Sequence, residues 1–351
     1  MLTTPTCKPG LWLAITAVFV ACGGKENRAT DHPPKATAKR DAGAAARRCR
    51  VAPSLRWPLR GRQGRDWVIN NYVDVDPGTG SVRDYTGASG GVAKTYDGHT
   101  GVDIDIPSFR QMDLGAPVLA AADGTVVEVS DDQPDRNTRC TGTWNFVRVR
   151  HASGYVLTYG HLEKGSAAVK VGARVRAGAI IASVGSSGCS TQPHLHITVK
   201  DCNGAVVSPF GRELWKVPHD YAPELSVMDV MIRAGGHEGA ATLKQPAPNP
   251  TRVSTGELVG FGVTAAGGSA GDTVGIKAVE PDGSVLFERR HQFVKARRHT
   301  YWYWNYRVPN EPLVLSVQAT VNGYVATRRR LIVGALRGPA RPGGRVTPGR
   351  P

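Results

Sequence analysis

Short runs in which apolar and polar residues alternate follow one another from about residue 53 onward. Alternation with a period of two is typical of half-buried antiparallel strands. Between two of these runs, Ala152-Ser153-Gly154 is a turn signal that joins them into a hairpin. The pattern therefore predicts an antiparallel β-sheet with strands at 125–129, 145–150, 155–159, 179–184 and 194–199.

The C-terminal third repeats this pattern at nearly regular spacing. Turn signals such as Pro281-Asp282-Gly283 and Asn322-Gly323 separate the runs, as in β-sandwiches. The aromatic run Tyr301–Tyr306 predicts a strand with alternate aromatic side chains in the core, although aromatic faces also bind sugars. We expect a small immunoglobulin-like β-sandwich with strands at 258–263, 273–279, 284–289, 300–308, 313–321 and 324–333.

The whole chain is therefore expected to be mostly β. Pro and Gly are frequent between the two sets of strands, and the last residues are basic and contain no acid. These composition shifts predict a β domain over 53–217, a linker over 218–250, the sandwich over 251–335 and a disordered basic tail over 336–351.

An apolar segment, Leu11–Ala21, precedes Cys22. It is too short to span a bilayer as a helix, but it matches the hydrophobic region of an export signal. Ala21-Cys22 resembles a bacterial lipobox, although Phe19 stands where Leu is usual, so simple secretion is the alternative. We predict a lipoprotein signal peptide over 1–22 and a flexible tether over 23–52. Gly23 after the lipidated Cys22 favours the outer membrane, with the protein facing the periplasm of the cell envelope.

Composition and charge narrow the class of protein. The chain has 351 residues, of which 40% are hydrophobic and 21% charged, so it is neither wholly disordered nor a polytopic membrane protein. The formal net charge of +15 favours an anionic partner, such as nucleic acid, a membrane surface or an acidic cell-wall polymer. No glycine-rich phosphate loop joins a strand to a helix, which gives nucleotide binding little support. We expect no nucleic-acid partner.

Five residues of the 53–217 domain form a candidate metal site, and each alone is a weak signal. The H-x-H pair opens a strand, so period two places both imidazoles on one face and the intervening leucine on the other. One imidazole can bind a metal while the other transfers a proton. An H-x-x-x-D segment adds an imidazole and a carboxylate, and two nitrogens with one oxygen are a usual ligand set for catalytic Zn²⁺. The five residues are His99, Asp103, His161, His194 and His196.

The order of these motifs resembles the lysostaphin-like (LytM-type) zinc endopeptidases, which cut peptidoglycan cross-bridges. Asp97–Ile104 resembles that family's first metal motif, and Tyr159-Gly160-His161-Leu162 resembles its Y-x-H-L turn. Pro193-His194-Leu195-His196 is similar to its last catalytic motif. The resemblance covers roughly residues 53–215, includes matches at 115–126 and 171–178, and departs from the family in long segments at 66–96 and 131–144.

Carried over residue by residue, the resemblance implies that His99, Asp103 and His196 bind one zinc ion. It implies that His161 and His194 are the catalytic pair beside the metal. Asp105 is the nearest rival ligand, because it lies on the same strand face as Asp103. The remaining histidines receive no role, because loops and termini account for them; they are His32, His151, His219, His237, His291 and His299.

The resemblance implies a zinc metalloendopeptidase that hydrolyses peptide bonds in peptidoglycan stems or cross-links through a zinc-activated water. We expect it to act as a monomer on the peptide part of peptidoglycan, held at the membrane by lipid on Cys22. The alternative is a non-catalytic cell-wall-binding or amidase-regulating module on the same fold. Members used in that way usually lose metal ligands, whereas this chain keeps all five site residues.

Four of the six cysteines remain once Cys7 leaves with the signal and Cys22 is lipidated, which predicts two disulfides in an exported protein. With the catalytic residues assigned as above, strand direction places the loops that carry Cys140 and Cys189 at the metal end of the sheet. Cys202 lies past the far end of its strand, roughly 20 Å away at 3.3 Å per residue. That distance disfavours Cys189–Cys202 unless the chain doubles back. We expect a disulfide between Cys140 and Cys189, which leaves Cys49 and Cys202 as the second pair.

Overall fold

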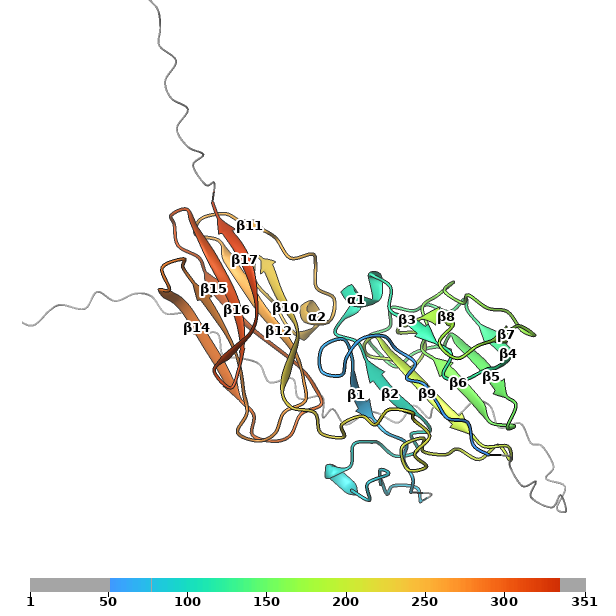
Figure 1. The fold of residues 1–351 in the computed structure, drawn as a ribbon. Coiled ribbons are helices and arrows are strands. Elements are labelled where there is room, and N and C mark those ends of the chain that lie inside the picture. Colours follow the sequence, from blue (N-terminus) through green and yellow to red (C-terminus); the bar gives the residue numbers. More distant parts are fainter. Residues whose placement is uncertain (1–50, 77, 335–351) are drawn as a thin grey trace, which may run out of the picture.

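The N-terminal half is built on a seven-stranded antiparallel sheet (Figure 1). The computed structural model describes residues 51–76 and 78–334. In sheet order the strands are β1 (Val68–Asn71), β2 (Val102–Asp105), β9 (His194–Lys200), β6 (Val156–Gly160), β5 (Phe146–His151), β4 (Gly124–Ser130) and β7 (Arg174–Val175). Beside it lie a small sheet and two short helices: β3 (Pro117–Leu119) with β8 (Ile180–Ser183), η1 (Gly90–Val92) and α1 (Phe109–Asp113).

Alternation along β9 explains how this sheet carries both a core and a site. Leu195 and Ile197 are fully buried in the hydrophobic core of the N-terminal half, as the period-two pattern predicts. His194 and His196 therefore share the opposite face. The predicted strands of this half and the predicted hairpin between β5 and β6 are confirmed.

The C-terminal half is a β-sandwich of two sheets around one hydrophobic core. One sheet has the order β10 (Ser226–Ala234), β12 (Leu258–Ala266) and β15 (His299–Arg307). The other has the order β11 (Arg252–Val253), β17 (Tyr324–Val333), β16 (Leu313–Val321), β13 (Thr273–Val279) and β14 (Val285–Gln292). All these pairs are antiparallel except β11 with β17. Alternate aromatic residues of β15, Trp302, Trp304 and Tyr306, pack against the core.

Part of the range 218–250, which the sequence predicts to be a linker, is structured. It contains the nine-residue strand β10 and the short helix α2 (Ala240–Lys244). The register of β10 against β12 shifts between Val227 and Asp229. Such an irregularity breaks the strict alternation by which a strand is recognised in a sequence. The glycine and proline residues on either side of β10 therefore make the whole range resemble a linker.

Several expectations fall outside the described residues. They are the signal peptide over 1–22, the lipid on Cys22, the tether up to residue 50 and the tail over 336–351. In the part of the chain that the structure describes, no helix is both long enough and apolar enough to cross a membrane.

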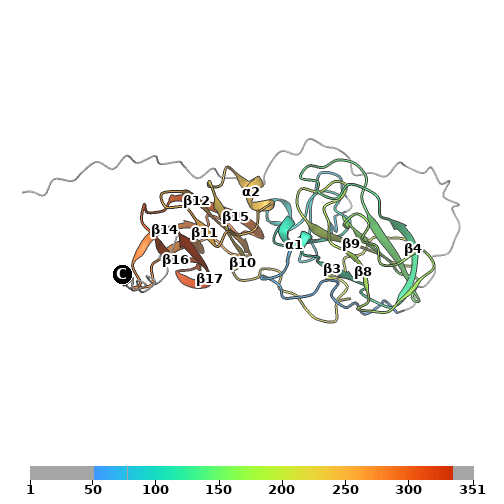
Figure 2. The ribbon, with the colours of Figure 1, turned by 90° about the horizontal axis from the view of Figure 1, so that it is seen from above.

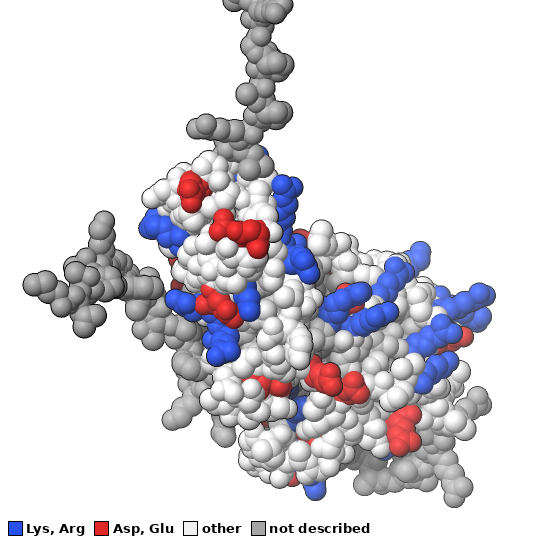
Figure 3. Space-filling view, turned by 60° about the vertical axis from the view of Figure 1, so that its left-hand side comes forward, with Lys and Arg blue, Asp and Glu red and all other residues white. Residues whose placement is uncertain are grey.

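The two halves lie side by side, with α1 of the first and α2 of the second at their junction (Figures 1 and 2). Polar contacts join them: α1 contributes Arg110, which forms an ion pair with Asp229 of β10. Lys244 of α2 donates to the carbonyl of Thr191 at 3.2 Å. On the face shown in Figure 3, Lys and Arg side chains lie over both halves, with Asp and Glu side chains between them.

Candidate functional site

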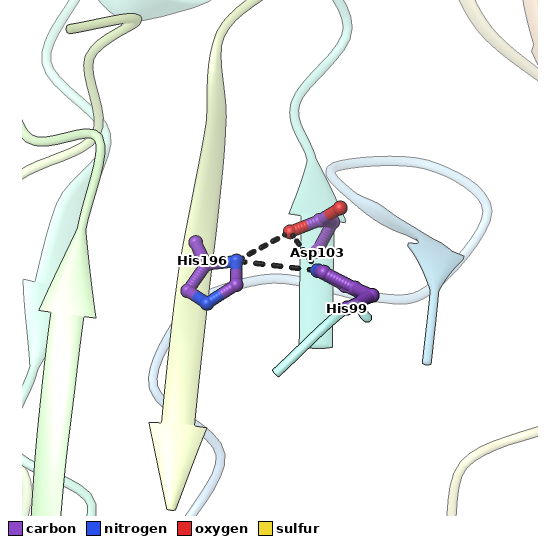
Figure 4. Close-up of side chains that lie close together, drawn as sticks. All are labelled: His99, Asp103 and His196. Carbon is purple, nitrogen blue, oxygen red and sulfur yellow. Dashed lines mark hydrogen bonds and ion pairs between the residues drawn. The ribbon is translucent and has the colours of Figure 1, made fainter. Parts of the chain in front are cut away.

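Three of the residues predicted as metal ligands converge on the face of β2 and β9. The two strands are antiparallel neighbours that place Asp103 opposite His196, and His99 lies in the turn just before β2. Asp103 Oδ1 lies 3.1 Å from His99 Nε2 and 2.9 Å from His196 Nδ1 (Figure 4). The two imidazole nitrogens are 3.3 Å apart. Among the described residues, this is the group of His, Cys, Asp and Glu that could hold a metal ion.

Hydrogen bonds behind the two imidazoles fix which nitrogen faces the centre. His99 Nδ1 donates to the Tyr72 carbonyl at 2.7 Å, and His196 Nε2 contacts Thr198 Oγ1 at 2.9 Å. In the tautomer in which His196 donates Nε2–H to the Thr198 hydroxyl, the atoms left at the centre, two ring nitrogens and a carboxylate oxygen, all have lone pairs directed at a shared point. Lone pairs this close repel unless a proton or a cation lies between them. The donor set therefore fits a divalent metal such as zinc, which prefers imidazole nitrogen with carboxylate oxygen.

Asp103 is buried in an environment that keeps it ionised. Burial alone would raise the pKa of its carboxyl. His99, His196 and His194 surround it, and these neighbours hold the pKa of Asp103 well below its usual value. The site thus presents a negative charge beneath the two imidazoles, as a cation site requires.

His161 and His194 lie together beside this group, with ring centroids 4.4 Å apart. His161 Nδ1 donates to the Ser187 carbonyl at 2.6 Å, and His194 Nδ1 donates to the Gln192 carbonyl at 2.9 Å. In each ring Nε2 is then the nitrogen that carries a lone pair. Burial, together with His194 and His196, holds the pKa of His161 well below its usual value, so its ring is neutral.

The backbone of His161 is held in a conformation that its own preferences disfavour. Its φ angle is +59°, in the left-handed region that residues other than glycine adopt infrequently. Strain of this kind persists only where the surroundings determine it, and it is common in functional sites. The position directly follows β6, so the turn swings the imidazole into the group of histidines.

Trp144 and a disulfide form one wall of the site. The half-buried indole of Trp144 lies with its ring centroid 4.9 Å from that of His161 and 5.4 Å from that of His196. The predicted Cys140–Cys189 disulfide is confirmed and ties the 131–144 segment to the loop before β9. Cys202 is also disulfide-bonded. Its predicted partner, Cys49, lies outside the described residues.

Asp105 and His299 lie outside the group of three predicted ligands and contact each other. Asp105, the rival ligand, directs Oδ2 at His299 Nδ1, 2.9 Å away, and its side chain is 2% exposed. The prediction that loops and termini account for the remaining histidines is wrong for His299, which begins β15 and whose side chain is buried against the N-terminal half. It is also wrong for His151 and His291, which lie in β5 and β14. Sequence analysis also missed Asn71, whose Nδ2 donates to Asp103 Oδ2 at 2.9 Å. The contacts of Asn71 with Asp103 and of His299 with Asp105 join residues far apart in the chain, and no short sequence motif indicates them.

Curated proteins similar to this chain include two that are named as endopeptidases. The DD-carboxypeptidase/endopeptidase Mpg of Neisseria meningitidis is 37% identical over 118 residues, which cover 34% of this chain and 23% of that protein. The peptidoglycan DD-endopeptidase ShyC of Vibrio cholerae is 36% identical over 98 residues, which cover 28% of this chain and 19% of that protein. The chain thus spans about a fifth to a quarter of the length of these relatives.

Among solved structures, the catalytic domain of lysostaphin from Staphylococcus simulans is similar at 26% identity, with a TM-score of 0.27, covering 41% of this chain and 88% of that one. The model of peptidase family M23 matches residues 97–209, a range that begins two residues before His99 and includes all five predicted site residues. This chain therefore contains a peptidase family M23 domain.

Proposed function

We propose that this chain is a zinc metalloendopeptidase that hydrolyses peptide bonds in peptidoglycan stems or cross-links. The observation that carries the proposal is the convergence of His99 Nε2, Asp103 Oδ1 and His196 Nδ1, all within 3.3 Å of one another. The family match and the names of the two relatives support the same reaction class and substrate class.

In this proposal His99, Asp103 and His196 hold the zinc, because their lone pairs already face one point. When bound, zinc supplies a Lewis acid that lowers the pKa of a coordinated water to about 7. Asp103 contributes the negative charge of the ligand set. The Tyr72 carbonyl and Thr198 hold the two imidazoles in orientation from behind, as outer hydrogen bonds do in zinc sites.

His161 and His194 act as the proton-transfer pair. Each donates Nδ1–H to a backbone carbonyl, which fixes the ring and leaves Nε2 to accept a proton from the attacking water. Because the pKa of His161 is depressed, that ring stays neutral, and its Nε2 is a hydrogen-bond acceptor. The second imidazole, once protonated, can stabilise negative charge on the carbonyl oxygen that is under attack.

Other features of the chain support a cell-wall substrate. A formal net charge of +15 suits an anionic wall polymer. Export and lipidation at Cys22 would place the protein in the cell envelope, at the outer membrane facing the periplasm. Trp144, held next to the disulfide, supplies an apolar wall against which a peptide stem can pack.

Gly101 offers a test of the ligand geometry that removes no ligand. A Cβ at this position would lie 2.3 Å from His196 Nε2. We expect Gly101→Ala to displace the His196 imidazole and to weaken zinc binding at least about 10-fold, as loss of ligand orientation does. Gly91→Ala is the matched control, because a Cβ there meets nothing within 4 Å. Zinc affinity measured by chelator competition decides, and equal affinities for the two variants would contradict the geometry.

The alternative, a non-catalytic cell-wall-binding or amidase-regulating module, makes the opposite prediction for the metal content of the purified protein. A zinc peptidase should carry about one zinc ion per chain, measured by atomic emission after dialysis against metal-free buffer. A regulator that does not use the site should carry none. A chain that cannot be loaded with zinc would refute the proposed function.

A further inference from the structure

The C-terminal sandwich contacts the metal-site edge of the N-terminal sheet. β1 and β2, which form that edge, are the strands of the sheet nearest to the sandwich in Figure 1. β15 supplies His299 to Asp105 of β2, and Tyr301 Oη donates to the Pro107 carbonyl at 3.3 Å. Just before β15, Arg298 Nη1 donates to Asn71 Oδ1 of β1 at 3.0 Å. The C-terminal sandwich therefore contacts β1, β2 and the segment just after β2, next to the predicted ligands.

Arg298 connects to a ligand through one amide. Asn71 accepts from Arg298 on Oδ1 and donates through Nδ2 to Asp103 Oδ2 at 2.9 Å. A guanidinium has donors only, so the Asn71 oxygen must face it. The amide nitrogen is then directed at Asp103. Arg298, a donor, and the ionised Asp103, an acceptor, both require this orientation, and Arg298 holds the amide in place from the side opposite Asp103.

The Asn71 amide in turn fixes the orientation of the Asp103 carboxylate. With Oδ2 held by Asn71, the other oxygen, Oδ1, is the one directed at the imidazoles of His99 and His196, as Figure 4 shows. A carboxylate held by one oxygen cannot rotate away from a metal bound to the other. We propose that Arg298 is a positioning residue for the metal site, acting through Asn71 on Asp103. This inference rests on the proposed function.

A buried hydrogen bond between His299 and Asp105 fixes the position of this connection. His299 Nδ1 lies 2.9 Å from Asp105 Oδ2, and the two side chains are 1% and 2% exposed. Gln192 Nε2 contacts the same oxygen of Asp105, and the Gln192 carbonyl accepts from His194. The start of β15 is thereby fixed to both β2 and the loop before β9. Arg298 is the residue before His299, so the contact between His299 and Asp105 also holds Arg298 next to Asn71.

The test measures zinc affinity by competition with a chromophoric chelator in the full-length protein. Loss of a hydrogen-bond partner of a ligand typically costs about 10–100-fold in metal affinity. We expect Arg298→Ala to weaken zinc binding about 10-fold or more and Arg298→Lys, which keeps a charged donor, to weaken it less. Asn71→Ala tests the same connection from its other end and leaves the charges of the junction in place.

The matched control is Arg110→Ala, which removes an ion pair between the two halves. Asp229 keeps a partner in that variant, because Arg329 lies 3.0 Å from its second oxygen. We expect zinc affinity like that of the wild type. If Arg110→Ala weakens zinc as much as Arg298→Ala does, the effect is a general loosening of the junction and the inference is wrong.

A double variant separates a connected pair from two independent effects. If Arg298 acts through Asn71, the variant carrying both alanines should bind zinc as the Asn71→Ala protein does. Additive losses would overturn the inference, as would wild-type affinity in both single variants. Either result leaves the proposed function intact as long as the wild type binds zinc. A wild type that binds no zinc refutes the proposed function, and this inference with it.

Discussion

The His196→Ala protein is expected to bind no zinc under conditions in which the wild type binds one ion per chain. His196 Nδ1 lies within 3.3 Å of both other ligand atoms, so its loss removes one of three ligands from the centre of the set. The effect should exceed the roughly 10–100-fold loss that follows removal of a ligand's hydrogen-bond partner. Atomic emission on the purified variant measures it.

His291→Ala is the control for this experiment, since His291 lies on β14 of the sandwich and contacts Trp302. It should keep zinc at the wild-type level. Treatment of the wild type with a chelator should abolish hydrolysis, and added zinc should restore it. Full activity in excess chelator, or a zinc-loaded His196→Ala protein, would contradict the assignment of the ligands.

The His161→Ala and His194→Ala proteins should keep their zinc and lose turnover. Neither residue is in the group of three that could hold a metal ion, and Nε2 of each ring is left for proton transfer because Nδ1 donates to a carbonyl. General acid–base catalysis contributes about 10²–10⁴-fold, so kcat should fall by that factor. The measurement is kcat on a defined cross-linked muropeptide, with zinc content determined on the same samples.

The two variants need not be equal, and a difference between them assigns the stronger base. A His161→Ala enzyme with normal kcat would remove His161 from the mechanism. Loss of zinc from either variant would mean that the residue holds the metal, and it would then be reclassified as a ligand. Double substitution should cost about as much as the more severe single change if the two imidazoles act on one proton-transfer step.

The sequence predicts the site because the predicted ligands lie on neighbouring segments with simple spacing, and because the order of the motifs resembles that of the lysostaphin-like family. His194 and His196 are two residues apart on one strand, and His99 and Asp103 are four apart around the start of another. Antiparallel pairing of β2 with β9 then brings Asp103 opposite His196. Strand direction was also sufficient for the Cys140–Cys189 disulfide, because both loops adjoin strand ends at the site.

Contacts between the two halves are different in kind. Asn71 and Arg298 are 227 positions apart, and nothing in either segment indicates the other. The polar residues Arg297, Arg298 and His299 look like a loop before the aromatic strand, yet the structure buries His299 against Asp105. Contacts of this kind depend on how the N-terminal and C-terminal halves pack against each other. The alternation of apolar and polar residues along a strand carries no information about that packing. The irregular strand β10 was missed for a related local reason, the register shift at Val227 and Asp229.

The most direct test of the account is a digest of purified, cross-linked peptidoglycan, analysed by mass spectrometry. Zinc-loaded wild-type protein and the His194→Ala variant should be compared in parallel. If the proposed function is correct, the wild type releases peptides with new amino termini, one water added for each bond cut, while the variant leaves the peptides whole. Intact peptides after digestion with the wild type, over the whole range of cross-link types, would contradict it. Equal cleavage by the two proteins would contradict the assigned site.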